Sequence, residues 1–165
     1  MRPNRETIFY FLVVEKTAGK MASILFASPN APHGFLSNFY RSPFCVAGVW
    51  YSSSEAYFQS QKFPGNPAFQ QRIAGSSPAM AARLGRSRSN PLRPDWNSVR
   101  DDVMRTALRH KFQGHPELRR ALLATGNRKL KEHRWADAYW GDGGNGKGRN
   151  RLGVLLMELR ESLRS

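Results

Sequence analysis

Glu55 and Lys62 are the two residues whose types and spacing best suit chemistry. They lie seven residues apart in a segment predicted to be helical from Glu55 to Phe63, so they are about 20° apart around the helix axis and about 10 Å apart along it. Both side chains can therefore reach one ligand. A carboxylate and an amine on a face that also carries Phe58 and Gln59 suit acid–base or covalent work at a sugar carbon. The alternative is a solvated face whose two charges do not interact.

Residues 137–142 form a second chemical cluster, in which Asp137 and Asp142 flank Tyr139 and Trp140. Aromatic rings stack on bases, and carboxylates stabilise the positive charge that builds on a sugar ring. The same spacing also fits a core tryptophan and a turn aspartate. Trp96 has the same two interpretations, as a core anchor or as a stacking platform.

A glycine-rich loop follows, because residues 141–153 hold six of the 14 glycines and three cations, among them Lys147. Backbone amides of such a loop at the start of a helix bind phosphate well, so the pattern predicts an anion cradle. Gly141 to Lys147 fits the first part of the nucleotide loop G-x-x-x-x-G-K-[ST], but Gly148 stands where a hydroxyl should hold magnesium. A phosphate-cleaving loop is therefore disfavoured, and a plain surface turn is the remaining alternative.

The charge of the chain favours anionic partners. Among 165 residues, 26 are basic and 12 acidic, which gives a net charge of +14 and attracts nucleic acid or phosphorylated metabolites. The excess is uneven: no carboxylate occurs between Glu55 and Asp95, an interval that holds six cations, namely Lys62, Arg72, Arg83, Arg86, Arg88 and Arg93. This interval should carry a positive patch, used either for non-specific adhesion to nucleic acid or for a phosphate pocket.

Several classes of protein are disfavoured by composition. Cys45 is the single cysteine, so an internal disulfide framework is excluded, and the four histidines never approach a zinc-ligand spacing with it. The apolar run at residues 8–14 is too short to span a membrane. We therefore expect no metal site and no membrane contact.

The periodicity predicts a single compact α+β domain at residues 21–165, helix-rich with a few short strands. Residues 1–20 are set apart as an N-terminal extension, in which residues 8–14 read as a strand and residues 16–20 as a linker; its order and its translation are left open. The predicted strands are 24–26, 44–47 and 49–51, and the predicted helices are 55–63, one from just after Asp95 to Gly114, one from Pro116 to near Gly126, and one capped by Asn150 whose apolar stripe is Leu152, Leu155, Leu156, Leu159 and Leu163.

Six motifs occur in an order that is far more specific than any one of them. They are G-F-L-S-N-F at 34–39, S-E-A-Y-F-Q-S-Q-K-F at 54–63, G-R-S-R at 85–88, P-L-R-P-D-W at 91–96, D-A-Y-W-G-D-G-G at 137–144 and L-L-M-E-L-R at 155–160. With these motifs the chain resembles the NADAR family, and within it the YbiA-type bacterial N-glycosidases, over about residues 24 to 163.

This resemblance implies a cytoplasmic hydrolase of N-glycosidic bonds that needs neither a metal nor a redox cofactor. The implied substrates are phosphorylated ribosylamino-pyrimidine intermediates of riboflavin biosynthesis, cleaved to ribose 5-phosphate and the base. Other members of the family are similar to hydrolases that remove ADP-ribose from guanine bases of nucleic acid, which is the alternative. A further alternative is a non-catalytic nucleotide or nucleic-acid binding module, supported by charge and aromatic residues alone.

The resemblance also implies roles for individual residues. Glu55 matches the catalytic carboxylate, Asp137 a second acid near the sugar, and Lys62 either a Schiff-base amine or a phosphate or hydroxyl ligand. Ala56 departs from the family, which often has His there, so a histidine proton shuttle is not expected at this position. The predicted substrate-binding residues are Asn38 and Phe39 in the pocket, Arg86 and Arg88 at the phosphate, Trp96 and Trp140 at the base, and Gly141, Gly143, Lys147 and Asn150 in the glycine-rich segment.

Overall fold

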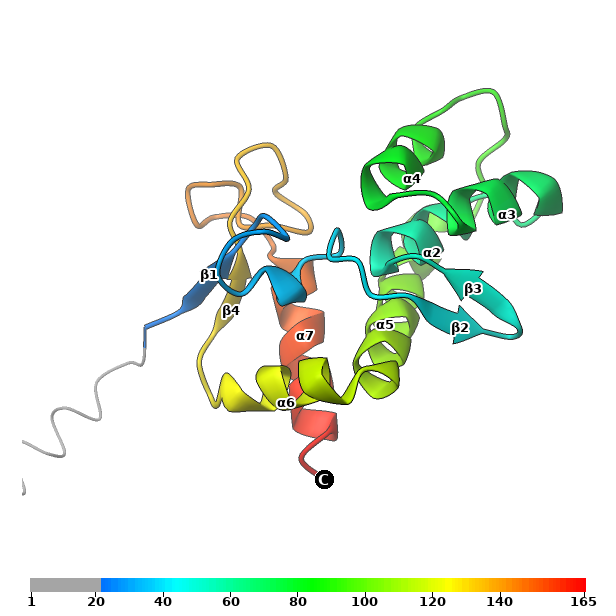
Figure 1. Ribbon diagram of the computed structural model, residues 1–165. Helices are drawn as coiled ribbons and strands as arrows, with labels where there is room; N and C mark the ends of the chain where they lie inside the picture. The colour runs from blue at the N-terminus through cyan, green and yellow to red at the C-terminus, as the bar shows by residue number, and fades with distance from the viewer. Residues whose placement is uncertain (1–21) are drawn as a thin grey trace, which may run out of the picture.

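The computed structural model describes residues 22–165, so the predicted extension with its strand at 8–14 lies outside the described residues. The described part has six α-helices, one short 3-10 helix and four short strands, which confirms the predicted helix-rich α+β fold (Figure 1). In chain order the elements are β1 (Ile24–Phe26), η1 (Gly34–Leu36), β2 (Phe44–Val46), β3 (Val49–Tyr51), α2 (Ser54–Ser60), α3 (Pro67–Ala74), α4 (Pro78–Gly85), α5 (Trp96–Gly114), α6 (Pro116–Ala124), β4 (Leu130–Glu132) and α7 (Arg151–Ser162).

Helix α5 lies in the middle of the fold and contacts both halves of it. On one side it packs against α2 and the β2 strand, and on the other against α6 and α7. Figure 1 shows α3 and α4 beyond α2, and the β1–β4 pair beyond α7. The two halves therefore meet along α5.

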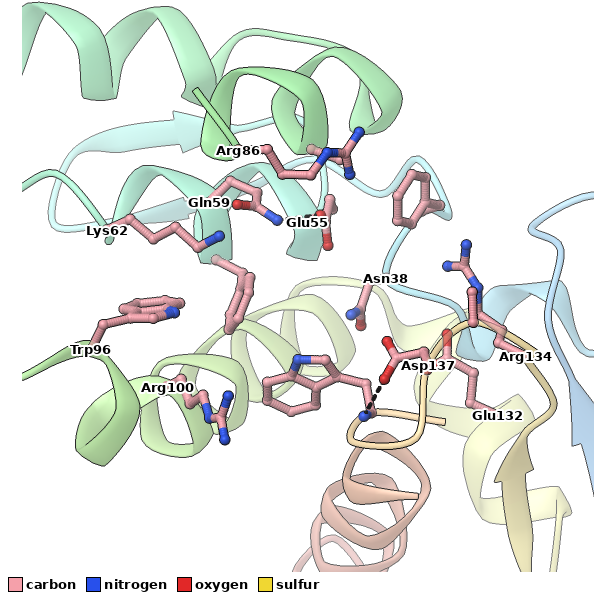
Figure 2. A pocket seen from close by; sticks show the side chains of 15 residues that line it. Asn38, Glu55, Gln59, Lys62, Arg86, Trp96, Arg100, Glu132, Arg134 and Asp137 are labelled. Carbon is pink, nitrogen blue, oxygen red and sulfur yellow. Dashed lines mark hydrogen bonds between the residues drawn. The ribbon is translucent and has the colours of Figure 1, made fainter. Parts of the chain in front are cut away.

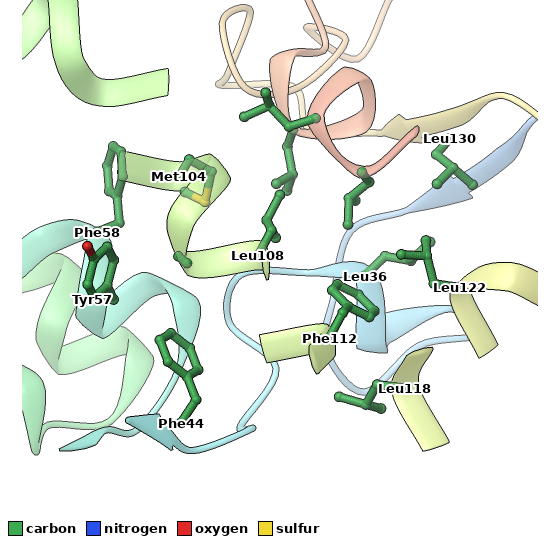
Figure 3. Packing of buried hydrophobic residues seen from close by; sticks show 14 of the residues in the cluster. Leu36, Phe44, Tyr57, Phe58, Met104, Leu108, Phe112, Leu118, Leu122 and Leu130 are labelled. Atoms are coloured by element: carbon green, nitrogen blue, oxygen red, sulfur yellow. The ribbon is translucent and has the colours of Figure 1, made fainter. Parts of the chain in front are cut away.

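The apolar faces of these helices form the main core (Figure 3). Leu152, Leu155 and Leu156 of α7 are at most 1% exposed, as the leucine stripe predicts, while Leu159 and Leu163 are partly buried and pack against the same core. Burial of each such side chain contributes about 1.5–3 kcal/mol.

Helix α2 is shorter than predicted. Its first turn is capped by Ser53, whose Oγ accepts a hydrogen bond from the Ala56 amide at 3.1 Å, as Ser caps commonly do. The helix ends at Ser60 instead of Phe63, because the chain already turns at residues 61–62 before Pro64. Lys62 therefore extends from a turn and not from the helix that carries Glu55.

Two helices and one strand were not predicted from the periodicity of the sequence. Helices α3 and α4 each begin with a proline after a capping residue, Asn66 and Ser77, a known start signal. Strand β4 pairs in parallel with β1, so that Ile24 lies opposite Leu130 and Phe26 opposite Glu132. This pairing is non-local and brings Glu132 beside the junction of the two halves.

Asn150 corrects one sequence prediction. It occupies the N-cap position of α7 in the left-handed region, with φ of 49°, and its side chain makes no capping hydrogen bond. Instead Oδ1 accepts from the Glu132 amide at 2.9 Å and Nδ2 donates to the Leu130 carbonyl at 2.8 Å. Asn150 therefore ties α7 to β4 because the strand edge supplies better partners than the helix terminus.

Candidate active site

A pocket of about 380 Å³ opens where α2, α5 and residues 132–140 meet. Figure 2 shows charged side chains entering it from several elements. None of the helices within residues 22–165 is long and apolar enough to cross a membrane. Of the sequence-predicted site residues, those that line the pocket are Asn38, Phe39, Glu55, Lys62, Arg86, Trp96, Asp137 and Trp140.

Glu55 lines the pocket from the first turn of α2. Its side chain is 6% exposed and its Oε1 accepts a hydrogen bond from Gln59 Nε2 at 2.7 Å, a contact between residues one helical turn apart. Burial raises the pKa of Glu55, against the opposing effects of the Gln59 hydrogen bond and of nearby cations, Lys62 foremost. A buried carboxylate with a raised pKa is a stronger base once it is ionised.

Lys62 presents its amine beside Glu55 from the turn after α2. Its Nζ donates to the Gly85 carbonyl at 3.3 Å and lies 5.5 Å from the Trp96 ring centroid. Burial lowers the pKa of Lys62, although the Glu55 charge raises it. A lowered pKa leaves more amine unprotonated, which is the form that attacks carbon.

Gly85 at the end of α4 allows this close packing. A Cβ at this position would collide with the amide group of Gln59, so a larger residue would displace the partner of Glu55. The glycine of the G-R-S-R motif therefore supports the site through contact with α2.

Asp137 is held rigidly on the opposite side. Its Oδ1 accepts from the amides of Tyr139 at 3.0 Å and Trp140 at 2.7 Å, as in an Asx turn. Figure 2 shows the carboxylate directed into the pocket near Asn38. The orientation of Asp137 is thus fixed by the backbone of the D-A-Y-W motif.

Three aromatic residues line one side of the pocket and are called the aromatic wall: Phe58, Trp96 and Trp140. Phe58 packs edge-to-face on Trp96, at 4.8 Å between ring centroids, and on Trp140, at 5.3 Å. Such contacts add about 0.5–1.5 kcal/mol per pair and hold the rings in place. The wall is therefore a preformed surface for a flat ligand, and Trp96 is in addition a core residue, since it is 7% exposed.

The loop that carries Asn38 and Phe39 is anchored by Lys111 of α5. This lysine is fully buried and donates to the carbonyls of Phe35 at 2.7 Å and Ser37 at 3.0 Å. Burial lowers the pKa of Lys111 to about 7. Burial of this lysine costs free energy, which the two hydrogen bonds partly offset.

Sequence reasoning missed three charged residues of the pocket, Glu132, Arg100 and Arg134. Glu132 is 3% exposed, and burial, followed by the effects of nearby carboxylates, raises its pKa to about 7 against the opposing charge of Arg134. One sequence pattern could have identified Glu132. The alternation of Leu130, Lys131 and Glu132 is typical of a strand and places Glu132 on the same inner face as Leu130.

Arg88 lies outside the pocket, in a second hollow of about 370 Å³ whose lining includes Lys62 and Arg86 as well. Both of these cations also line the main pocket, so the two hollows adjoin. The lining of the second hollow includes no Asp or Glu. This is the location that the charge pattern between Glu55 and Asp95 predicts for an anion.

The predicted anion cradle in the glycine-rich loop is corrected by the hydrogen bonds of its amides. Gly141, Gly143, Lys147 and Asn150 do not line the pocket, and Lys147 is exposed. The loop folds back on residues 137–142, so that most of its amides donate hydrogen bonds within the chain. The amide of Gly143 donates to Asp137, those of Gly144 and Gly148 to Asp142, that of Lys147 to Asn145, that of Arg149 to Ala138 and that of Asn150 to Gly141. The loop supports Asp137 and Trp140 and offers few free donors.

No group of three or more His, Cys, Asp or Glu side chains among residues 22–165 is arranged to hold a metal ion. The functional groups that line the pocket are carboxylates, an amine, guanidinium groups, side-chain amides and aromatic rings.

Residues 25–164 match the NADAR domain, and the chain belongs to the NADAR family. The N-glycosidase YbiA of Shigella boydii is 56% identical over 140 residues, which cover 85% of this chain and 88% of that relative. The NMR structure of Escherichia coli YbiA superposes with a TM-score of 0.80 at 53% identity, covering 88% of this chain and 86% of that one.

A longer relative carries a name that concerns a pathway. The riboflavin biosynthesis protein VVA0006 of Vibrio vulnificus is 45% identical over 140 residues, which cover 85% of this chain but 38% of that protein.

Proposed function

We propose that the protein hydrolyses the N-glycosidic bond of phosphorylated ribosylamino-pyrimidine intermediates of riboflavin biosynthesis, releasing ribose 5-phosphate and the base. One observation carries this proposal: Glu55, Lys62 and Asp137 line a single pocket together with the aromatic wall. The names of the relatives, N-glycosidase and riboflavin biosynthesis protein, support the bond type and the substrate class.

The charges of the pocket suggest one orientation of such a substrate. The base rests on the aromatic wall at Trp140, next to Asp137, and the phosphate points toward the cationic second hollow with Arg86 and Arg88. The ribose then lies between Glu55 and Asp137. The side-chain oxygens of Asn38 and Gln59 are buried and have no hydrogen-bond partner among the described residues, so they are free to accept from ribose hydroxyls.

Direct hydrolysis is the first of two routes that this geometry supports. Glu55 takes a proton from a water molecule as its oxygen bonds to the anomeric carbon, and the electron pair of the breaking carbon–nitrogen bond moves to the nitrogen, which takes up a proton. The Asp137 carboxylate stabilises the positive charge on the sugar in the transition state. One water molecule is consumed.

The second route is covalent and uses Lys62. Its free amine adds to the anomeric carbon of the ring-opened imine, the bond to the base amine breaks, and a Schiff base to Lys62 remains. Water then adds to this imine and releases the ribose aldehyde and the free lysine, so the net consumption is again one water. The lowered pKa of Lys62, caused first by burial, favours this route.

Chromatographic assay of base release tests the proposal. Glu55→Ala should lower the rate at least about 100-fold, as expected for loss of an acid–base group, while Glu117→Ala, which removes an exposed carboxylate of α6, should leave it unchanged. Retained release in Glu55→Ala would remove Glu55 from the mechanism. Reduction with borohydride during turnover should trap a ribose phosphate adduct on Lys62 if the covalent route operates, and Lys62→Met should abolish the adduct.

A second candidate activity is removal of ADP-ribose from guanine bases of nucleic acid. The net charge of +14 and the second hollow, with Lys62, Arg86 and Arg88, favour it because they suit a polyanion and an additional phosphate. Turnover of both substrates at physiological salt separates the two. Binding of nucleic acid without turnover of either substrate would instead indicate a non-catalytic module.

A further inference from the structure

Glu132 is the one buried carboxylate of the pocket that the proposed routes leave without a task. It ends β4, where its amide donates to Asn150 Oδ1 at 2.9 Å and its carbonyl accepts from the Asp142 amide at 2.8 Å. Its backbone is also fixed by the pairing with Phe26 of β1. The side chain therefore enters the pocket from a rigid element, as a group that acts on a substrate must.

The three pocket carboxylates have different surroundings. Glu55 accepts from Gln59 and lies near the cations Lys62, Arg134 and Arg86. Asp137 accepts from backbone amides. For Glu55, burial raises the pKa and is only partly offset by the Gln59 hydrogen bond and the cations.

Glu132 has fewer partners that stabilise its charge. Its carboxyl group accepts no hydrogen bond from any described residue, and one cation, Arg134, faces it. The carboxylates of Glu55 on α2 and of Asp137 and Asp142 on the following loop also face it. His133, on the same loop, is paired with Asp142 at 3.0 Å. Burial first, and the three negative charges second, raise the pKa of Glu132 to about 7 against the charge of Arg134, so that a large share of this carboxyl group carries its proton near neutral pH.

The position of Glu132 complements that of Lys62. Figure 2 shows the two side chains on opposite sides of the pocket, with Glu55 between them. A nucleophile that approaches the anomeric carbon from the Lys62 and Glu55 side drives the nitrogen out toward the side of Asp137 and Glu132. A proton donor is required there, because an amine anion is a poor leaving group.

We propose that Glu132 is a further catalytic residue, the general acid that protonates the departing nitrogen. This role rests on the proposed function. As the carbon–nitrogen bond breaks, its electron pair takes the proton of the Glu132 carboxyl group, which becomes a carboxylate. The attacking water gives its proton to Glu55, and transfer of that proton back to Glu132 restores the starting state, so that atoms and charge balance over the cycle.

The first test compares leaving groups in the wild type and in Glu132→Gln, which keeps the shape of the side chain. With a ribosylamino-pyrimidine 5-phosphate, the variant should be about 100-fold slower, because the leaving nitrogen needs a proton. With nicotinamide mononucleotide, whose pyridinium nitrogen leaves as a neutral base, the rate should change less than about threefold. Equal losses on both substrates would overturn the role, since a merely structural defect does not distinguish leaving groups.

The second test is the pH dependence of kcat/KM on the aminopyrimidine substrate. Wild-type activity should fall above about pH 7 as Glu132 loses its proton, and Glu132→Gln should lack this alkaline decline. The same alkaline decline in Glu132→Gln would overturn the role of Glu132. If the nicotinamide compound is not cleaved by the wild type, this pH dependence is the deciding test. Absence of turnover by the wild type contradicts the proposed function itself, whereas full activity of Glu132→Gln contradicts the role of Glu132 and leaves that function intact.

Discussion

Replacement of Glu132 by Gln should change the dependence of stability on pH, independently of any substrate. Burial first, and nearby carboxylates second, raise the pKa of Glu132 from 4.5 to about 7 in the folded chain. Between these two values the folded state binds the proton and the unfolded state does not. The stability that Glu132 contributes is therefore fully present below pH 4.5 and is lost as the pH rises to about 7.

The size of this loss follows from the two pKa values. A separation of about 2.5 units, at about 1.4 kcal/mol per unit, corresponds to about 3 kcal/mol. That is a large part of the free energy of unfolding of an ordinary domain. Glutamine is neutral throughout, so Glu132→Gln should gain about 3 kcal/mol relative to wild type between pH 4.5 and pH 8.

Urea unfolding of both proteins at four or five pH values measures this difference directly. The comparison is necessary because burial also lowers the pKa of Lys111 to about 7. Above neutral pH, Lys111 therefore makes the free energy of unfolding increase with pH. This contribution is the same in both proteins and cancels in the difference. Glu117→Gln on the exposed face of α6 should stay within about 0.5 kcal/mol of wild type at every pH. A difference between Glu132→Gln and wild type that does not change with pH would refute the surroundings inferred for Glu132.

Two further predictions concern residues that hold the site or its substrate. Asn150→Ala removes the partners of the Glu132 amide and the Leu130 carbonyl; it should cost about 1–3 kcal/mol in urea unfolding and also lower kcat, and an unchanged unfolding curve would contradict the link between α7 and β4. Arg88→Ala should raise KM about tenfold, the effect of one charged phosphate contact, with kcat within about twofold. Arg83→Ala on the exposed side of α4 is its control, and an equal rise in KM there would show that only net charge matters.

The central part of the fold could be predicted from the sequence because its signals are local. The apolar stripes predicted α5 and α7, and Pro116 marked the start of α6. Helices α3 and α4 were missed because they are eight residues each and carry few large apolar residues. Their start signals, Asn66 and Ser77 before prolines, were nevertheless present.

The candidate site divides in the same way. Glu55 and Lys62 lie within one motif, so their proximity followed from spacing, even though Lys62 extends from a turn. Glu132 could not be found this way, because it enters the pocket through a three-residue strand whose partner lies near the other end of the described chain. Non-local pairing leaves no local periodicity to read.

The glycine-rich loop shows a different limit of the sequence. Its glycines at 143, 144 and 146 do adopt positive φ angles, as the composition suggests. What composition does not show is where the amides point, and here they bond inward to the motif that carries Asp137. The residue types of this loop are therefore typical of a phosphate-binding loop, whereas its hydrogen bonds show that it supports the segment that carries Asp137.

The pairing of β1 with β4 joins residues 106 positions apart. Closing so long a segment costs more chain entropy than forming α2 or the hairpin of β2 and β3, so this side of the fold is expected to assemble late. A nascent chain that has emerged only as far as α5 already holds Glu55 and Lys62, but it still lacks Asp137 and Glu132. The pocket is therefore complete only after the last quarter of the chain has been synthesised and β4 has paired with β1.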